Sequence, residues 1–180
     1  MAAKPHRCLL QWPERGQADA GARPLVLDTN IVLDLLLFAD AAVASVRRLL
    51  DAQQLCWVAT PPMRDELVRV LAYPQIVPRL AFYGLTAGQL LQTYEAQVRW
   101  VDVAPRVSAV CKDADDQHFI DLAVAHRAIL LSKDNAVLCM QKRLLALGAH
   151  VATAIVFEAD ERLEIAPASA AATPAAMQIA

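Results

Sequence analysis

The sequence predicts an α/β fold: a three-layer α/β/α sandwich around a mainly parallel central sheet of about five strands. Short β-prone runs alternate with longer segments of 3.6-residue periodicity, which implies crossover connections between parallel strands. The runs are almost continuously apolar, as strands covered on both faces are. Hydrophobic residues make up 57% of the chain and charged residues 20%, which suits one compact domain.

Five runs are expected to form the strands of this sheet. In chain order they are PLVLD (24–28), LCWVA (55–59), RWVDVA (99–104), AILLS (128–132) and VATAIVF (151–157). The segments between them are expected to be helical, and the chain shows no internal repeat.

The polar, Gly/Pro-dotted start and the Ala-rich end divide the chain into three parts. We expect a flexible leader at 1–23, a single domain at 24–158 and a flexible tail at 159–180. No apolar run approaches the ~20 residues of a membrane span, and the start lacks the apolar core of a secretory signal. The four cysteines lack paired C-x-x-C spacing and are expected to be reduced thiols. These features predict a cytoplasmic protein without a membrane partner.

Acidic residues recur where the predicted strands end and helices begin. Asp28 closes the first strand, and Asp134 follows the fourth. Thr60 is expected to cap a helix whose first turn holds two prolines, which puts Glu66 on its core-facing side. If Asp113 caps the next helix, Asp116 falls on the inward stripe of that helix. Each acid could instead cap a helix or accept backbone bonds.

The four acids Asp28, Glu66, Asp116 and Asp134 are expected to converge at the carboxyl ends of the strands, where such sheets bind ligands. Two carboxylates ~4 Å apart repel by about 4 kcal/mol at an effective dielectric near 20. A divalent ion removes that conflict, and oxygen-only ligands favour Mg²⁺ or Mn²⁺. The chemistry that follows is phosphodiester hydrolysis through a metal-activated water.

The ordered motifs VLDTN, DELVRVL, CKDADDQHFIDLA and LLSKD resemble the PIN-domain ribonucleases, in particular the VapC-type toxins of bacterial toxin–antitoxin modules. The resemblance covers roughly residues 24–157. It implies a PIN-like fold, Mg²⁺- or Mn²⁺-dependent endoribonuclease activity, an RNA substrate and a cognate antitoxin. It also implies that Asp28, Glu66, Asp116 and Asp134 are the catalytic, metal-binding acids, with Asn30 and Ser132 in support.

Two positions depart from the resemblance or lie outside it. Ala136 stands where many relatives carry a further acid, which argues against a second metal ion. Asp34 lies about one helical turn beyond Asn30, where relatives vary, and is interpreted as peripheral to the site.

Contacts to the substrate and to partner proteins are expected from two other features. Lys112 and Lys133 each adjoin an acidic motif and are candidate phosphate contacts; ordinary solvated surface charge is the alternative. The segment 71–100 is rich in Leu, Tyr and Phe. It is expected either to pack internally or to form a homodimer or antitoxin-docking surface.

Two other functions remain open from the sequence. An aspartate after a first strand can act as the nucleophile of an aspartyl phosphatase, although the DTN order lacks the second aspartate that would serve as the acid. A non-catalytic PIN-like protein that binds RNA or a partner is the other alternative, and Ala136 is its main support.

Overall fold

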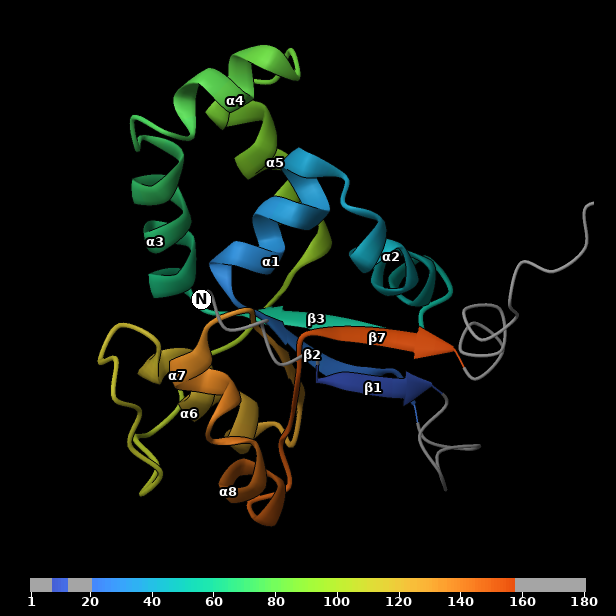
Figure 1. The fold of residues 1–180 in the computed structure, drawn as a ribbon, viewed down its shortest axis with the longest axis vertical. Helices are drawn as coiled ribbons and strands as arrows, with labels where there is room; N and C mark the ends of the chain where they lie inside the picture. Colours follow the sequence, from blue (N-terminus) through green and yellow to red (C-terminus); the bar gives the residue numbers. More distant parts are fainter. Residues whose placement is uncertain (1–7, 13–20, 158–180) are drawn as a thin grey trace, which may run out of the picture.

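The computed structural model describes residues 8–12 and 21–157, and its main sheet confirms the predicted fold class (Figure 1). Five parallel strands are hydrogen-bonded in the order β4-β3-β2-β5-β6. Their bounds are Arg23–Leu27 (β2), Leu55–Ala59 (β3), Arg99–Trp100 (β4), Ile129–Leu131 (β5) and His150–Ala152 (β6).

Helices cover both faces of this sheet, with α1 to α5 on one side and α6 to α8 on the other (Figure 1). The α-helices are α1 (Thr29–Leu33), α2 (Ala44–Asp51), α3 (Pro61–Leu71), α4 (Val77–Phe82), α5 (Ala87–Gln97), α6 (Gln117–Ala125), α7 (Asn135–Leu138) and α8 (Gln141–Ala146). A π-helical turn, η1 (Asp34–Phe38), and a 3₁₀ turn, η2 (Ala41–Val43), join α1 to α2.

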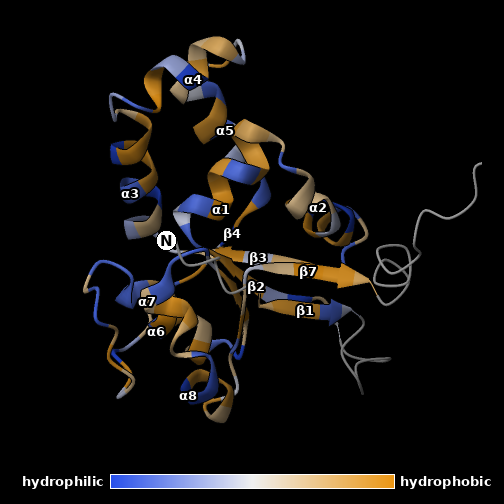
Figure 2. Cartoon of the chain, in the orientation of Figure 1, coloured by the Kyte–Doolittle hydropathy of each residue, from blue (hydrophilic) through white to orange (hydrophobic). Residues whose placement is uncertain are grey.

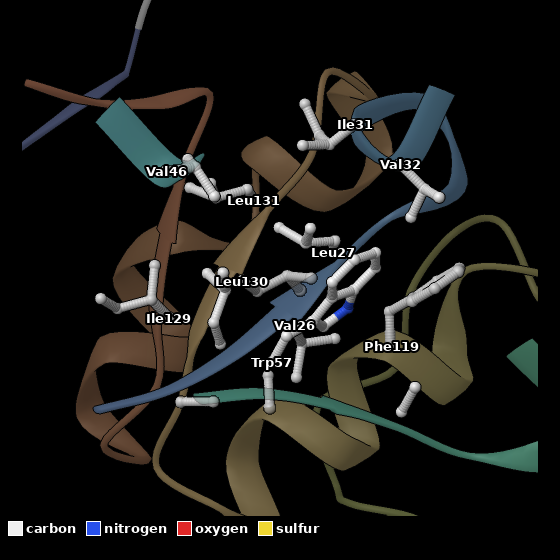
Figure 3. Packing of buried hydrophobic residues seen from close by; sticks show 14 of the residues in the cluster. Val26, Leu27, Ile31, Val32, Val46, Trp57, Phe119, Ile129, Leu130 and Leu131 are labelled. Atoms are coloured by element: carbon white, nitrogen blue, oxygen red, sulfur yellow. The ribbon is translucent and has the colours of Figure 1, made fainter. Parts of the chain in front are cut away.

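The core lies on both faces of the central strands. Leu25, Val26 and Leu27 of β2 are at most 3% exposed, so the strand is buried on both sides, as its unbroken apolar run predicts. Trp57 of β3 and Phe119 of α6 are among the large side chains packed beside them (Figure 3). Polar residues concentrate on the helices rather than on these strands (Figure 2).

The order of the strands creates a switch point beside β2. The chain runs outward from β2 to β3 and β4, then returns to the other side of β2 to form β5 and β6. Ligands of such sheets bind outside the carboxyl ends of the strands at this reversal. The segments that follow β2 and β5 are therefore the first places to look for a site.

The third and fifth predicted strands are those whose bounds were wrong. The run predicted as a strand over 99–104 is a strand only at Arg99 and Trp100, because β3 ends at Ala59 and turns into α3. The Val101 amide makes a further bond to the Ala59 carbonyl at 3.0 Å. The run predicted as one strand over 151–157 is two strands: β6 joins the main sheet, and β7 (Ala154–Phe157) leaves it.

A second, two-stranded sheet holds part of the predicted leader. Leu9–Trp12 forms β1, which pairs in parallel with β7, so these four residues are ordered and correct the expectation of a flexible leader at that point. The amide of Thr153 donates to the carbonyl of Cys8 at 2.7 Å, which fixes the start of this sheet. Residues 1–7, 13–20 and 158–180, including the predicted tail, lie outside the described residues.

Within the described ranges, no single helix is long and apolar enough to cross a membrane. One pair of segments, Thr29–Phe38 with Ala41–Asp51, passes that test together by length and composition, but is bent by 108°.

Candidate active site at the ends of β2 and β5

Asp28 follows β2 directly and lies at the switch point. Its backbone amide donates to the carbonyl of Leu131 at 3.0 Å, which extends the pairing of β2 with β5 by one residue. One carboxylate oxygen, Oδ2, accepts hydrogen bonds from Asn30 Nδ2 at 2.7 Å and from Ser132 Oγ. Burial raises the pKa of Asp28, while these two bonds lower it and the charge on Glu66 raises it further.

The turn after β5 carries Asp134 into the same place. Ser132 is fully buried, and its hydroxyl accepts a bond from the Asp134 amide at 2.9 Å while donating to Asp28. The Lys133 amide donates to Asn30 Oδ1 at 3.2 Å, so both sides of the Asn30 amide are used. Asp134 Oδ1 caps α7 by accepting from the Ala136 amide at 2.7 Å. A single hydrogen-bonded network therefore joins Asp28 to Asp134.

Glu66 reaches the site from α3. That helix begins at Pro61 after Thr60, as predicted, although the Thr60 side chain makes no capping bond. Thr29 Oγ1 donates to Glu66 Oε1 at 2.7 Å, and His118 Nε2 lies 3.1 Å from Glu66 Oε2. Burial raises the pKa of Glu66, but the contacts with His118 and Thr29 outweigh it and hold that pKa below its ordinary value.

Asp116 is the fourth acid, and its placement corrects one prediction. The helix begins at Gln117 with Asp116 at the N-cap position, so Asp113 does not cap it; Asp113 instead accepts a bond from the Asp115 amide. The Asp116 side chain makes no capping bond either, so neither carboxylate caps α6.

The environment of Asp116 disfavours its charged form. Burial and the charges on Asp28, Asp134, Asp113 and Glu66 raise its pKa to about 7. Its Oδ2 atom is buried and has no hydrogen-bond partner among the described residues. The structure thus places Asp116 within electrostatic reach of the other three predicted acids, and leaves its Oδ2 atom unsatisfied.

The other predicted residues have different surroundings. Asp34 is buried, and its carboxylate pairs with the Lys133 ammonium group, so it adjoins the site and is not peripheral. Lys133 was predicted as a phosphate contact; its Nζ also lies 3.8 Å from Asp40 Oδ2. Lys112 is exposed in the loop before α6.

Three residues of this region were not predicted to act there. Thr29 and His118 both contact Glu66, and Gln117 supports the loop before α6. His118 lies two residues after Asp116, in the first turn of α6. Asp121 of the same helix is buried and accepts bonds from the Gln117 side chain and from the Val107 amide.

The donor chemistry of the site fits a hard divalent cation. The four acids offer only oxygen, and the unpartnered Asp116 oxygen together with the mutual repulsion calls for positive charge. As the side chains stand, residues 8–12 and 21–157 contain no group of three or more His, Cys, Asp or Glu arranged to hold a metal ion. The residues therefore fit a divalent cation by the type of their donor atoms and by their charge, and not by a ready-made arrangement of ligands among the described residues.

Comparison with known proteins identifies the family. A PIN-domain family model matches residues 24–136, which is more than half of the chain and includes all four acids. The chain belongs to the PIN-domain family. A solved structure with this fold is VapBC2 from Rickettsia felis bound to a DNA fragment from its promoter; it is 13% identical, with a TM-score of 0.50, and the match covers 71% of this chain and 96% of that one. A search of curated proteins finds no match for this PIN-domain chain.

Proposed function

We propose that this PIN-domain chain is a metal-dependent endoribonuclease that hydrolyses RNA phosphodiester bonds in the cytoplasm. One observation carries the proposal: Asp116 has a buried, unpartnered carboxylate oxygen beside three other acids, and burial together with the neighbouring negative charges raises its pKa to about 7. Such a cluster is costly as long as no cation is bound, and metal sites on hydrolytic enzymes use this donor chemistry.

Asp28, Glu66, Asp116 and Asp134 would hold Mg²⁺ or Mn²⁺. When bound, the ion supplies activation of water and offsets charge on phosphate oxygens. Asn30 and Ser132 orient Asp28 through their bonds to its Oδ2, and Ser132 also fixes the Asp134 backbone. Thr29 and His118 orient Glu66 in the same manner, since each contacts a different carboxylate oxygen.

The biological role we propose is that of a toxin neutralised by a partner antitoxin. The support is the sequence resemblance to VapC-type toxins, and the likeness in fold to a VapBC2 complex. An exposed apolar surface on α4 and its flanking turns fits a docking role for an antitoxin or a second copy. Its side chains are Tyr73 (43% exposed), Val77 (50%), Phe82 (79%) and Tyr83 (43%).

A non-catalytic PIN-like role is the second candidate, favoured by the lack of a ready-made metal cluster among the described residues and by Ala136 in place of an acid. The phosphatase alternative is weaker. Asn30 occupies the position two residues after Asp28, and its amide is committed to Asp28 and to the Lys133 backbone.

Cleavage of single-stranded RNA by the full chain tests these functions. We expect endonucleolytic cleavage with Mg²⁺ or Mn²⁺ that stops in EDTA and in Asp28→Asn. Asp65→Asn is the matched control, because Asp65 adjoins Glu66 but its side chain is 76% exposed. RNA binding without cleavage in either metal would contradict the nuclease and favour the second candidate. A trapped aspartyl-phosphate at Asp28 would favour the phosphatase.

A further inference from the structure

Asp34 is a buried carboxylate in an otherwise apolar helical segment. It is 6% exposed and stands between Leu33 and Leu35, which are 7% and 1% exposed. A carboxylate in such a place carries a large desolvation cost unless a positive group compensates it. The ammonium group of Lys133 supplies that charge as an ion pair, although Asp34 Oδ2 has no hydrogen bond within residues 8–12 and 21–157. The two residues are almost a hundred positions apart in the chain.

The π-helical turn η1 brings a second acid to the same lysine. The Asp40 amide donates to the Asp34 carbonyl at 3.0 Å, and Ala39 between them adopts a left-handed conformation with φ of 48°. This wide turn places Asp40 Oδ2 3.8 Å from Lys133 Nζ. π-Helical turns are rare and are frequent at functional sites. Here the turn gathers two carboxylates around one cation.

Lys133 is also held through its backbone. Its amide donates to Asn30 Oδ1, in the helix that follows Asp28. Its neighbours in sequence are Ser132, which bonds Asp28, and Asp134, one of the four acids. The short turn between β5 and α7 is therefore attached to the α1–η1 segment twice, by the lysine side chain and by its amide.

We propose that Asp34 is a positioning residue which, through Lys133, fixes the turn 132–134 against α1 and η1. We call the ion-paired group Asp34, Lys133 and Asp40 the clamp. The consequence for metal binding rests on the function proposed above: by fixing the turn, the clamp sets where the Asp134 carboxylate stands relative to Asp28. Lys133 then serves as the internal counter-charge of the clamp and does not contact the phosphate of the substrate.

Hydrogen exchange of the full chain in EDTA tests the clamp without any metal. The variants are Asp34→Asn, Lys133→Met and the double variant, with Asp51→Asn as the control at an exposed aspartate. We expect amide exchange in the peptide spanning 131–138 to accelerate about tenfold in each single variant and to remain unchanged in the control. Because Asp34 acts through Lys133, the double variant should exchange no faster than Lys133→Met alone.

Calorimetric titration with Mn²⁺ gives the second readout. We expect binding to weaken roughly 10- to 100-fold in each single variant, the range found for residues that orient metal ligands, and the double variant to be no weaker than either. A protein merely loosened overall would change its melting temperature but not in this non-additive way. If Asp34→Asn does not fold, Lys133→Met alone still decides the proposal, because that side chain is 45% exposed.

Unchanged exchange in both single variants, or effects that add in the double variant, would overturn the clamp. So would a Lys133→Met variant that raises KM for RNA while its exchange and Mn²⁺ affinity stay at wild-type values, since that result makes Lys133 a phosphate contact. Failure of the nuclease proposal looks different: the wild-type chain would neither bind Mn²⁺ nor cleave RNA, while exchange in EDTA would still report on the clamp.

Discussion

The two sides of the candidate site are built differently. At the ends of β2 and β5, Asp28 and Asp134 are held by Asn30, Ser132 and backbone amides. At the start of α6, the Asp116 Oδ2 atom is buried with no hydrogen-bond partner within residues 8–12 and 21–157. Hydrogen bonds thus fix Asp28 and Asp134, which we call the fixed side of the site. Asp116, on the second side, is buried among like charges that raise its pKa. We infer that a cation held by the four acids would relieve the second side more than the first.

Asp28→Asn should have the largest effect on activity, because it removes a charge from the fixed side while keeping its shape. The asparagine oxygen can still accept the bonds from Asn30 and Ser132, so folding should persist. We expect RNA cleavage to fall more than ~100-fold, beyond the effect of losing a residue that only orients a ligand. Rates measured beside Asp65→Asn check this; cleavage within a few-fold of wild type would remove Asp28 from the site.

Asp116→Asn should also lower cleavage, though less than Asp28→Asn, and should stabilise the protein in EDTA at pH 8. This opposite pair of effects would distinguish Asp116 from the acids at the ends of β2 and β5. The folded-state pKa of Asp116 is raised to about 7, above the ordinary carboxyl value of about 4. The favourable contribution of its protonated form is therefore present at low pH and lost as the pH rises through 7. Thermal melts in EDTA between pH 5 and 8 should show wild-type stability falling with pH, and a flatter curve for the variant. Parallel curves would contradict the electrostatic account.

Ser132→Ala removes the hydroxyl group that connects Asp28 to the Asp134 backbone. The hydroxyl is fully buried, donates to Asp28 and accepts from the Asp134 amide, so its loss leaves both groups short of a partner. We expect about 1–3 kcal/mol of destabilisation and a drop in cleavage of roughly tenfold or more. Urea unfolding together with cleavage rates provides the measurement. Ser132→Thr, which keeps the hydroxyl, is the matched comparison.

Ala39→Gly should have the smallest effect, a slight stabilisation. The left-handed conformation at φ of 48° costs a residue with a Cβ atom roughly 1–2 kcal/mol, and glycine avoids this cost while losing about 0.4–1 kcal/mol through the unfolded chain. A net stabilisation of about 0.5 kcal/mol should appear in urea unfolding, with cleavage unchanged. Destabilisation would show that the η1 turn depends on the alanine methyl group.

Much of the fold could be predicted because the central strands are nearly unbroken apolar runs, which two-sided burial requires. The break at Thr153 could not, since the residues on both sides are equally apolar. It is fixed by hydrogen bonds to the Cys8 carbonyl, 145 residues away. β1 was missed for the same reason: its four residues show no pattern by themselves and form a strand only against β7.

The site was predictable where sequence neighbours act together and obscure where they do not. Asp28 with Asn30, and Ser132 with Asp134, are short local motifs at strand ends. The contact of His118 with Glu66 joins residues on two helices that only the tertiary fold brings together. The burial of Asp34 is similar, because its partner Lys133 comes from a different strand end. Charge compensation across the fold leaves no mark on either segment alone.

The small β1–β7 sheet has a consequence for synthesis of the chain. Its register pairs Leu9 with Ala154 and Trp12 with Phe157, so the first strand of the described residues to be synthesised cannot pair until the last one has been made. Until then, β1 has an unpaired backbone edge, while the main sheet up to β5 can already assemble. A nascent chain stalled before residue 150 would therefore contain all four acids of the site, while β1 would have no β7 to pair with.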